Sequence, residues 1–355
     1  MQRQILNGIA CVILFTFFSN ALQAQQKEYK INTIAFYNLE NLFDTVDDPN
    51  KDDHQNPIGE MSEGEAERVY PLKIKNMAKV IADIGTAKSG YPPAVLGVCE
   101  VENYQVLEDL VNHPRLSAYN YGILHYESPD RRSIDVALLY RKDIFRPLFS
   151  KPHEVILYRD GDLNKRSYTR DVLYVKGMLD GDEMHFLVNH WPSRGGGEKK
   201  SRPRRVEAAK VAKRVIDSVQ LVDPNAKIML MGDLNDGVYN ESVKGVLQTK
   251  KNKTDLKLPT DVWNPYESIF QEGVGTIAWR DSWDLFDQII ITKPLTIEND
   301  YSSYRFYQAG VFNPPYLRNP RGRYKGYPFR SFSNSAWTNG YSDHFPVYIY
   351  LIKEI

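Results

Sequence analysis

Residues 227–236 read KIMLMGDLND, an apolar run that ends in acidic and amide residues. The uninterrupted apolar stretch is typical of a strand buried on both faces, and it predicts a strand over residues 227–231. Asp233 and Asn235 follow this strand directly. Polar side chains at the end of a buried strand lie at the edge of a sheet, where neighbouring strands together form a cleft. The segment therefore predicts a layered fold with a polar site at one edge.

The same combination of a strand and a polar end recurs along the chain. Short or alternating apolar runs predict eight further strands, over residues 29–37, 94–99, 121–125, 134–140, 172–179, 184–188, 286–291 and 346–352. Polar residues stand at the ends of several of them, namely Asn38, Glu40, Glu100, His190, Asp287, Asp343 and His344.

Each of these polar residues, taken alone, also has a structural explanation as a turn residue, a helix cap or a buried histidine. Their recurrence at successive strand ends is harder to explain in that way. Carboxylates, amides and two histidines in one place suit a hard divalent cation that handles a phosphate oxygen.

Helical patterns lie between the strands. They predict helices over residues 72–84, 104–112 and 204–221, with a weaker candidate over 240–247. Strands outnumber helices and many neighbouring elements are joined by short loops, which favours an α/β layered sandwich. Tyr301 to Tyr341 holds twelve aromatic residues, four prolines and four glycines, and this composition predicts a long irregular loop. Its aromatic rings are expected either to stack on unpaired bases or to pack as a lid over the cleft.

The net charge is zero, because 45 basic and 45 acidic residues cancel. Together with 42% hydrophobic content, this excludes a disordered chain and a compact nucleic-acid module. The charges are nevertheless segregated, since Asp44 to Glu67 holds nine acidic residues, while Arg194 to Arg214 holds nine basic ones. Asp48, Asn50 and Asp52 have the alternate spacing of a calcium loop, but the following positions do not match it. We interpret this acidic segment as a solvated loop, with a second calcium site as the alternative.

The N-terminus has the features of a signal peptide. An apolar run over residues 9–18 is too short to span a bilayer and is followed by small residues, which predicts a signal peptide over residues 1–24 and a single domain over 25–355. We therefore expect a periplasmic or secreted monomer without stable membrane insertion. Cys99 is the only cysteine beyond the signal peptide, so no intramolecular disulfide can form.

Four motifs together resemble the endonuclease/exonuclease/phosphatase superfamily, whose fold is called DNase I-like. They are YNLEN at 37–41, NHWPSR at 189–194, GDLND at 232–236 and SDHFPV at 342–347. The resemblance covers nearly the whole predicted mature chain and is closest to secreted bacterial members. It implies a four-layer α/β sandwich, in which two mixed β-sheets pack face to face with helices outside.

The resemblance also implies a metal site. Glu100 resembles the principal ligand of Mg²⁺, with Mn²⁺ or Ca²⁺ as alternatives. Asn38 and Glu40 match positions that hold this glutamate or the metal, and Asp343 is expected to bind the metal directly or through water. Mg²⁺ keeps most of its waters and needs only one or two protein carboxylates.

The same resemblance implies the catalytic groups. Asp233 resembles the residue that orients or deprotonates the attacking water, and Asn235 the amide that positions the phosphate. His344 and Asp287 resemble a His–Asp pair that acts as a base or a phosphate clamp. His190 matches a histidine that donates to a phosphate oxygen or to the leaving oxygen.

Two arginines are candidate substrate contacts. Arg132 precedes the segment SIDVALLYR, where the family often has a basic or aromatic phosphate contact, and a plain solvated arginine is the alternative. Arg194 stands beside three glycines directly after the NHWPSR motif, so a flexible loop is expected to bring its planar guanidinium to the phosphate.

These features together predict an exported Mg²⁺-dependent phosphoesterase that hydrolyses phosphodiester bonds by in-line attack of water, and we expect a nuclease acting on nucleic acid. One alternative is a phosphomonoesterase or phospholipase C-type enzyme acting on inositol phosphates or phospholipid headgroups. A second alternative is a non-catalytic binding protein on the same fold. The fold and metal site are shared among these functions, so the loops set the specificity.

Overall fold

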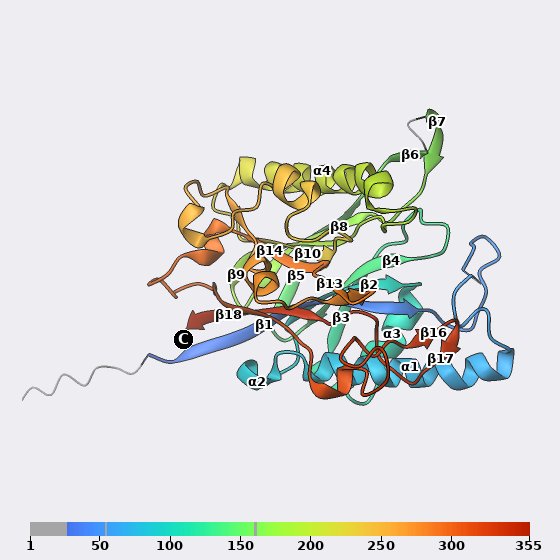
Figure 1. The fold of residues 1–355 in the computed structure, drawn as a ribbon. Coiled ribbons are helices and arrows are strands. Elements are labelled where there is room, and N and C mark those ends of the chain that lie inside the picture. Colours follow the sequence, from blue (N-terminus) through green and yellow to red (C-terminus); the bar gives the residue numbers. More distant parts are fainter. Residues whose placement is uncertain (1–26, 54, 160–161) are drawn as a thin grey trace, which may run out of the picture.

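Two six-stranded β-sheets form the centre of the protein in the computed structural model (Figure 1). The structure describes residues 27–53, 55–159 and 162–355, and the predicted signal peptide lies outside them. In the first sheet the order is β15 (Arg305–Val311), β18 (Val347–Glu354), β1 (Tyr29–Leu42), β2 (Val95–Val101), β4 (Asp135–Arg141) and β3 (Tyr121–His125). In the second it is β11 (Val262–Trp263), β14 (Asp287–Thr292), β10 (Ile228–Asp233), β9 (Asp182–His190), β8 (Val172–Leu179) and β5 (Phe145–His153).

Helices and short hairpins complete the fold. The α-helices are α1 (Glu63–Asp83), α2 (Thr86–Ser89), α3 (Tyr104–Asn112), α4 (Glu198–Val222) and α5 (Tyr266–Gln271). The hairpins pair β6 (Leu157–Arg159) with β7 (Asp162–Ser167), β12 (Ile277–Trp279) with β13 (Ser282–Asp284), and β16 (Phe332–Ser333) with β17 (Ala336–Trp337). Single helical turns are η1 (Ser117–Tyr119), η2 (Ser242–Val246), η3 (Lys253–Asp255), η4 (Lys293–Thr296) and η5 (Pro315–Leu317).

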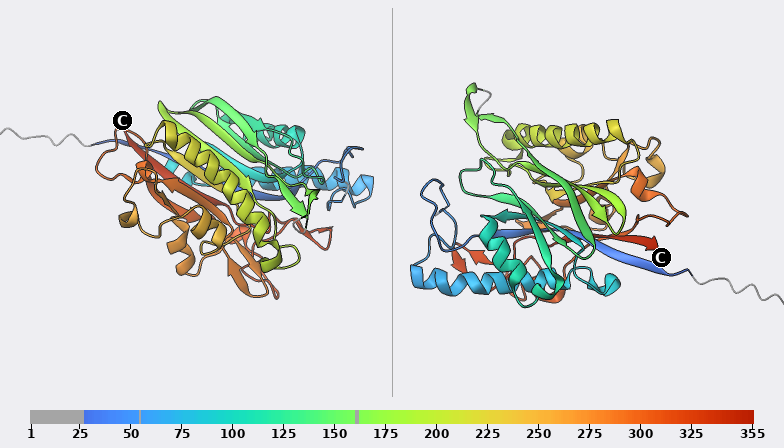
Figure 2. Two further views of the ribbon diagram at one scale, coloured as in Figure 1. Left: turned by 90° about the horizontal axis from the view of Figure 1, so that it is seen from above. Right: turned by 180° about the vertical axis from the view of Figure 1, so that it is seen from behind.

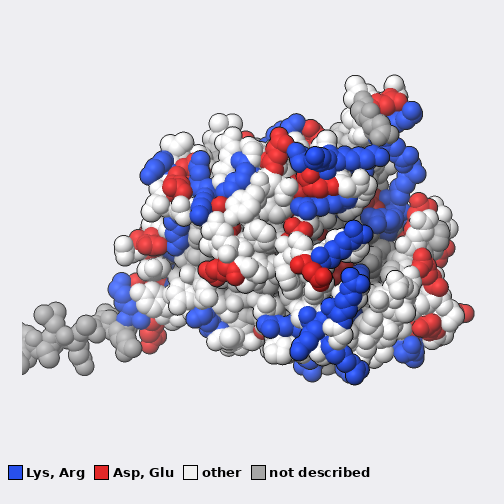
Figure 3. Space-filling view, viewed as in Figure 1, with Lys and Arg blue, Asp and Glu red and all other residues white. Residues whose placement is uncertain are grey.

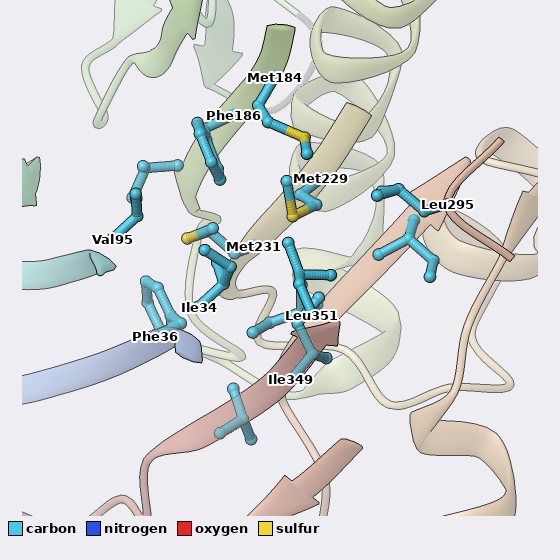
Figure 4. Close-up of a cluster of buried hydrophobic side chains, with 14 of the residues drawn as sticks. Ile34, Phe36, Val95, Met184, Phe186, Met229, Met231, Leu295, Ile349 and Leu351 are labelled. Atoms are coloured by element: carbon cyan, nitrogen blue, oxygen red, sulfur yellow. The ribbon is translucent and has the colours of Figure 1, made fainter. Parts of the chain in front are cut away.

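The two sheets pack against each other through apolar side chains. The inner faces meet in one buried cluster that includes Phe36, Phe186, Met231 and Ile349 (Figure 4). The fully apolar stretch of β10 follows from this packing, because its other face contributes Leu230 to a second buried cluster beneath α4. A strand that is covered on both faces buries all of its side chains, so nearly all of its residues are apolar.

Helices cover the outer face of each sheet. α1 and α3 pack on the first sheet, and α4 packs on the second, so the layers run helix, sheet, sheet, helix (Figures 1 and 2). This arrangement confirms the predicted four-layer α/β sandwich. Among the described residues, no helix is both long and apolar enough to cross a membrane.

Strand pairing brings polar residues of the second sheet into one row. β10 runs parallel to β9 and antiparallel to β14, and in this register Asp233 is paired with His190 on one side and with Asp287 on the other. The row lies at the end of β10, where the apolar core stops. The first sheet contributes Asn38 to this region. Asn38 lies on β1, which runs parallel to β2, and it is paired there with Cys99.

The irregular loop predicted over Tyr301 to Tyr341 is wrong in part. Its first section forms β15, which pairs with β18 at the edge of the first sheet and contains a register shift between Phe306 and Gln308. Edge strands tolerate such shifts and weak apolar patterns. The remainder holds η5 and the β16–β17 hairpin, and its other residues are irregular as predicted.

Two predicted helices begin earlier than expected. The prediction starts one helix just after Pro71 and the other just after Pro203, whereas α1 begins at Glu63 and α4 at Glu198. Proline interrupts a helical hydrogen bond, but tertiary packing sustains the turns before it. In α1, Ala66 and Val69 lie in a buried cluster with Ile58 and Phe332. The acidic segment predicted as a loop up to Glu67 is therefore helical in its last part.

Candidate active site

Two acidic residues and two histidines form the centre of the site. His344 Nδ1 lies 2.7 Å from Asp287 Oδ2, and its Nε2 lies 3.8 Å from Asp233 Oδ2. His190 Nε2 lies 3.7 Å from the same Asp233 oxygen. Both histidines therefore direct one ring nitrogen at the Asp233 carboxylate, and the structure brings together all four residues as the sequence predicts.

Asn38 connects the two sheets within the site. Its amide nitrogen lies 3.1 Å from Glu100 Oε1 and 3.1 Å from Asp233 Oδ2, so it donates to both carboxylates. The backbone N–H of Asn41 donates to the other Glu100 oxygen at 3.0 Å. Asn38 thus holds Glu100, and the side chain of Glu100 stays partly open to solvent.

The strand ends at the site adopt an unfavourable backbone conformation. Glu40, Glu100 and Asn235 have φ values of 45°, 57° and 49°, in the left-handed region that non-glycine residues rarely occupy. Each such residue costs about 1 to 3 kcal/mol, and surrounding contacts must hold it in place. The backbone N–H of Asn235 donates to Asp233 Oδ1 at 2.9 Å, and its side chain donates to the Trp191 carbonyl at 3.0 Å.

The two histidines have opposite protonation preferences. Burial lowers the pKa of His190 well below its usual value, and the positive charges of Arg170, His344 and Arg132 add to this effect. Burial also lowers the pKa of His344, but the carboxylates of Asp287 and Asp233 outweigh it and raise the pKa well above the usual range. At neutral pH we therefore expect a neutral His190 and a cationic His344.

Glu40 occupies a different environment from Glu100. Its Oε1 lies 3.2 Å from Arg330 Nε, and its Oε2 accepts from the backbone N–H of Ser331 at 2.6 Å. Arg330 also reaches Asp343 Oδ2 at 3.2 Å, so it bridges the two carboxylates. Glu40 therefore contacts residues of the 330–343 segment, and its predicted role at the metal stays a prediction.

The two predicted arginine contacts each pair with acidic residues of their own neighbourhood. Arg132 is half exposed and its Nε lies 3.6 Å from Asp130 Oδ1. Arg194 donates from Nε to the Asn235 carbonyl at 3.0 Å and lies 3.6 Å from Asp236 and Asp284. Arg194 therefore holds the loop after β10, and contact of either arginine with a phosphate stays a prediction.

Sequence analysis did not identify three cations around the site. They are Arg330, Lys73 and Arg170. Arg170 donates to the Trp191 carbonyl at 2.8 Å, while buried Lys73 bonds Ser331 and the Tyr341 carbonyl. The spacing of Lys73 gives a usable signal, because it falls four residues from both Val69 and Met77 on the buried face of α1.

A cavity of about 840 Å³ opens beside the site. Asp343 and Arg330 line it next to the carboxylates described above. Its wall carries Trp279 from the β12–β13 hairpin, Tyr324 and Arg323. The exposed fractions of the Trp279 and Tyr324 side chains are 69% and 54%, so both aromatic rings are accessible to a ligand. Figure 3 shows Lys and Arg gathered over the region where Figure 1 draws the segment around residues 312–341.

The oxygen-rich centre fits a divalent cation. The buried carboxylate of Asp233 and the partly buried one of Glu100 share one amide donor and therefore lie close together, and their negative charges repel each other unless a cation compensates them. Asp287 Oδ1 is buried without a hydrogen-bond partner among the described residues. Asp233, Asp287 and His344 also offer ligand atoms within 4.8 Å of one another. Carboxylate oxygens are the ligands that Mg²⁺ prefers.

A family of known proteins matches most of the chain. The Endonuclease/Exonuclease/phosphatase family model matches residues 33–353. The chain belongs to this family. Its members are metal-dependent phosphoester hydrolases, so the protein is a hydrolase of phosphoric esters. No curated protein matches the sequence.

Several solved structures share the fold. One is an endonuclease/exonuclease/phosphatase family protein of Bacteroides thetaiotaomicron, with 16% identity, a TM-score of 0.55, and coverage of 92% of this chain and 98% of that one. TDP2 of D. rerio, complexed with a single-strand DNA product, has 14% identity, a TM-score of 0.51 and coverage of 90% and 98%. A mannosyl-6-phosphatase of B. thetaiotaomicron has 17% identity, a TM-score of 0.53 and coverage of 90% and 99%.

Protonation of Asp233 should make metal binding depend on pH. Burial raises the pKa of Asp233 to about 7, with Asp287 and Glu100 adding to the shift and His344 opposing it. As the pH falls through 7, Asp233 takes up a proton and loses the charge that attracts a cation. We therefore expect the Mg²⁺ affinity, measured by isothermal titration calorimetry, to weaken by about tenfold per pH unit below 7. The slope should flatten in Asp233→Asn, and equal wild-type affinities at pH 6 and pH 8 would contradict this expectation.

Proposed function

We propose that the protein is an exported Mg²⁺-dependent phosphodiesterase that hydrolyses nucleic acid. The observation that carries this proposal is the cavity lined by Asp343, because it brings accessible aromatic rings and arginines next to this predicted metal ligand. Unpaired bases stack on aromatic side chains, and arginines bind the flanking phosphates. The relative from D. rerio, whose structure holds a single-strand DNA product, supports this choice.

Each residue of the centre has a separate role in the in-line hydrolysis of the phosphodiester. Ionised Asp233 accepts a proton from the attacking water, whose oxygen forms the new bond to phosphorus as the ester bond on the opposite side breaks. Cationic His344, held by Asp287, stabilises the negative charge that builds up on the phosphate oxygens. Neutral His190 donates a hydrogen bond to a phosphate or leaving oxygen. A Mg²⁺ ion held by Glu100, with Asp343 as a further ligand, would neutralise charge on the phosphate.

A second candidate function is the hydrolysis of a small phosphomonoester. The cavity volume falls within the range of about 300 to 1,000 Å³ that is typical of small-ligand pockets. An aromatic wall also fits the face of a sugar, and one structural relative is a mannosyl-6-phosphatase. Phospholipid headgroups belong to the same alternative. The hydrogen-bonded arrangement of Asn38, Glu100 and Asp233, with the His344–Asp287 pair beside it, argues against a non-catalytic binding protein.

A substrate comparison tests the proposal. We expect the protein to cleave both a single-stranded oligonucleotide and bis(p-nitrophenyl) phosphate when Mg²⁺ is present, and EDTA to abolish both activities. Trp279→Ala should lower kcat/KM for the oligonucleotide by about tenfold, because it removes one stacking contact. The small diester has no flanking nucleotides that could stack on Trp279, so we expect its hydrolysis not to change.

Tyr307→Ala is the matched control, because Tyr307 is an exposed aromatic residue on β15 outside the cavity lining. This variant should cleave both substrates at the wild-type rate. If the wild type releases phosphate from sugar or inositol phosphates but leaves DNA and RNA intact, the nuclease proposal is wrong and the phosphomonoesterase alternative is supported.

A further inference from the structure

The acidic segment between β1 and α1 encloses a second polar cavity, separate from the one beside Asp343. Its volume is about 410 Å³, and its lining includes Asp44, Asp53 and Glu102. Asp44 lies just beyond β1, and Glu102 follows the last residue of β2, so both belong to strand ends of the first sheet. Figure 1 draws this segment at the right-hand edge of the molecule, where Figure 3 shows several Asp and Glu side chains.

Two of the lining carboxylates are almost completely buried. The exposed fraction is 2% for Asp53 and 4% for Glu102. Asp53 Oδ2 accepts from the backbone N–H of Asp48 at 2.8 Å, but Asp53 Oδ1 has no hydrogen-bond partner among the described residues. A buried ionised oxygen without a partner is costly, and such groups normally bind a cation or neutralise.

Local hydrogen bonds orient the other two carboxylates. Glu102 Oε2 accepts from the backbone N–H of Asp44 at 2.7 Å, and Asp44 Oδ2 accepts from the Asn103 amide at 3.0 Å. The nearby cations are engaged elsewhere, since Lys51 pairs with Glu127 and Arg68 with Glu65. Within the described part of the chain, no Lys or Arg forms an ion pair with Asp44, Asp53 or Glu102.

We infer that this cavity binds Ca²⁺ through the carboxylates of Asp53, Glu102 and Asp44. Ca²⁺ takes six to eight oxygen ligands in flexible geometry, and backbone carbonyls and water complete its shell. Mg²⁺ requires a strict octahedron and is less suited to an open loop. The three residues with calcium-loop spacing, Asp48, Asn50 and Asp52, are exposed and lie outside the cavity lining, so they are not the proposed ligands.

A calcium ion at this place would stabilise a segment that contacts two other parts of the chain near the active site. The backbone N–H of Asp52 donates to the Arg131 carbonyl at 2.7 Å, which ties the segment to the loop that carries Arg132. Ile58 packs with Phe332, two residues from Arg330, on the other side. The ion would therefore order one segment that contacts the loop of Arg132, a candidate substrate contact, and Phe332 near Arg330, which lines the cavity beside Asp343.

The test separates this site from the catalytic one by using two variants. Isothermal titration calorimetry with CaCl₂ should detect about one site in Glu100→Gln, which lacks the principal catalytic ligand, and none in Glu100→Gln combined with Asp53→Asn. Saturating Ca²⁺ should raise the Tm of Glu100→Gln by about 5 °C. Asp53→Asn should remove that rise, and its Tm without calcium should be equal or higher because a buried negative charge is gone.

Asp48→Asn is the matched control, because it removes an exposed acidic group of the same segment outside the cavity lining. This variant, made in Glu100→Gln, should keep the calcium site and the rise in Tm. Calcium binding that survives Asp53→Asn, or its absence from Glu100→Gln itself, would overturn the inference. Neither result bears on the proposed phosphodiesterase activity, which is measured separately with wild-type protein and Mg²⁺.

Discussion

Replacing His344 with alanine should lower kcat/KM for phosphodiester hydrolysis by about 10³-fold. The imidazole bonds Asp287 through Nδ1 and directs Nε2 at Asp233, so its orientation is fixed before substrate binds. Burial lowers the pKa of His344, but Asp287 and Asp233 together raise it well above the usual range. The ring is therefore cationic at neutral pH, and alanine removes a positive charge at the place where negative charge develops on the phosphate.

Steady-state kinetics with bis(p-nitrophenyl) phosphate measure this loss, with Asp287→Asn and His113→Ala beside it. Asp287→Asn keeps the imidazole of His344 but removes a carboxylate that favours its cationic form. We therefore expect a smaller loss in kcat/KM, of about 10²-fold. His113 caps the far end of α3, away from the strand ends, and its replacement should leave the rate unchanged. Wild-type activity of His344→Ala at saturating Mg²⁺ would exclude His344 from the chemistry.

The central strands of both sheets can be predicted from sequence, whereas among the edge strands only β3 matches a predicted range. The predicted strand over 286–291 corresponds to β14 at Asp287–Thr292, because every residue of that strand is buried and therefore apolar or paired. β5 was not predicted, since FRPLFSKPH contains two prolines and polar residues and forms only an edge of the second sheet. An edge strand has a neighbouring strand on one side only and is partly open to solvent, so fewer of its residues need to be apolar.

The same difference separates the parts of the site. Asp233, His190 and Asp287 follow or open apolar strands, so strand pairing alone brings them into one row. Arg330 is 290 positions from its partner Glu40, and nothing in its neighbourhood distinguishes it from the other five basic residues of Tyr301 to Tyr341. Its contact depends on how an irregular segment folds back over the sheet, which local patterns do not encode.

Replacing Glu100 with glutamine should lower kcat/KM by at least about 10³-fold and weaken Mg²⁺ binding about 100-fold. The change keeps the size of the side chain and removes one negative charge. Glu100 accepts from Asn38 with one oxygen and from the Asn41 backbone with the other. Glutamine has only one oxygen, so its amide nitrogen faces one of these donors, which then has no acceptor. Both a ligand charge and a matched hydrogen bond are therefore lost.

Calorimetry and kinetics together separate the metal role of Glu100 from a structural one. Asn38→Ala leaves the carboxylate charge in place but frees it, so we expect a loss of Mg²⁺ affinity of about tenfold, part of which high Mg²⁺ restores in the kinetics. Glu108→Gln, on the exposed face of α3, is the charge-matched control and should behave as wild type. If Glu100→Gln binds Mg²⁺ at wild-type affinity yet is inactive, Glu100 acts on the phosphate or the water, and the metal must be held by Asp233 and its neighbours.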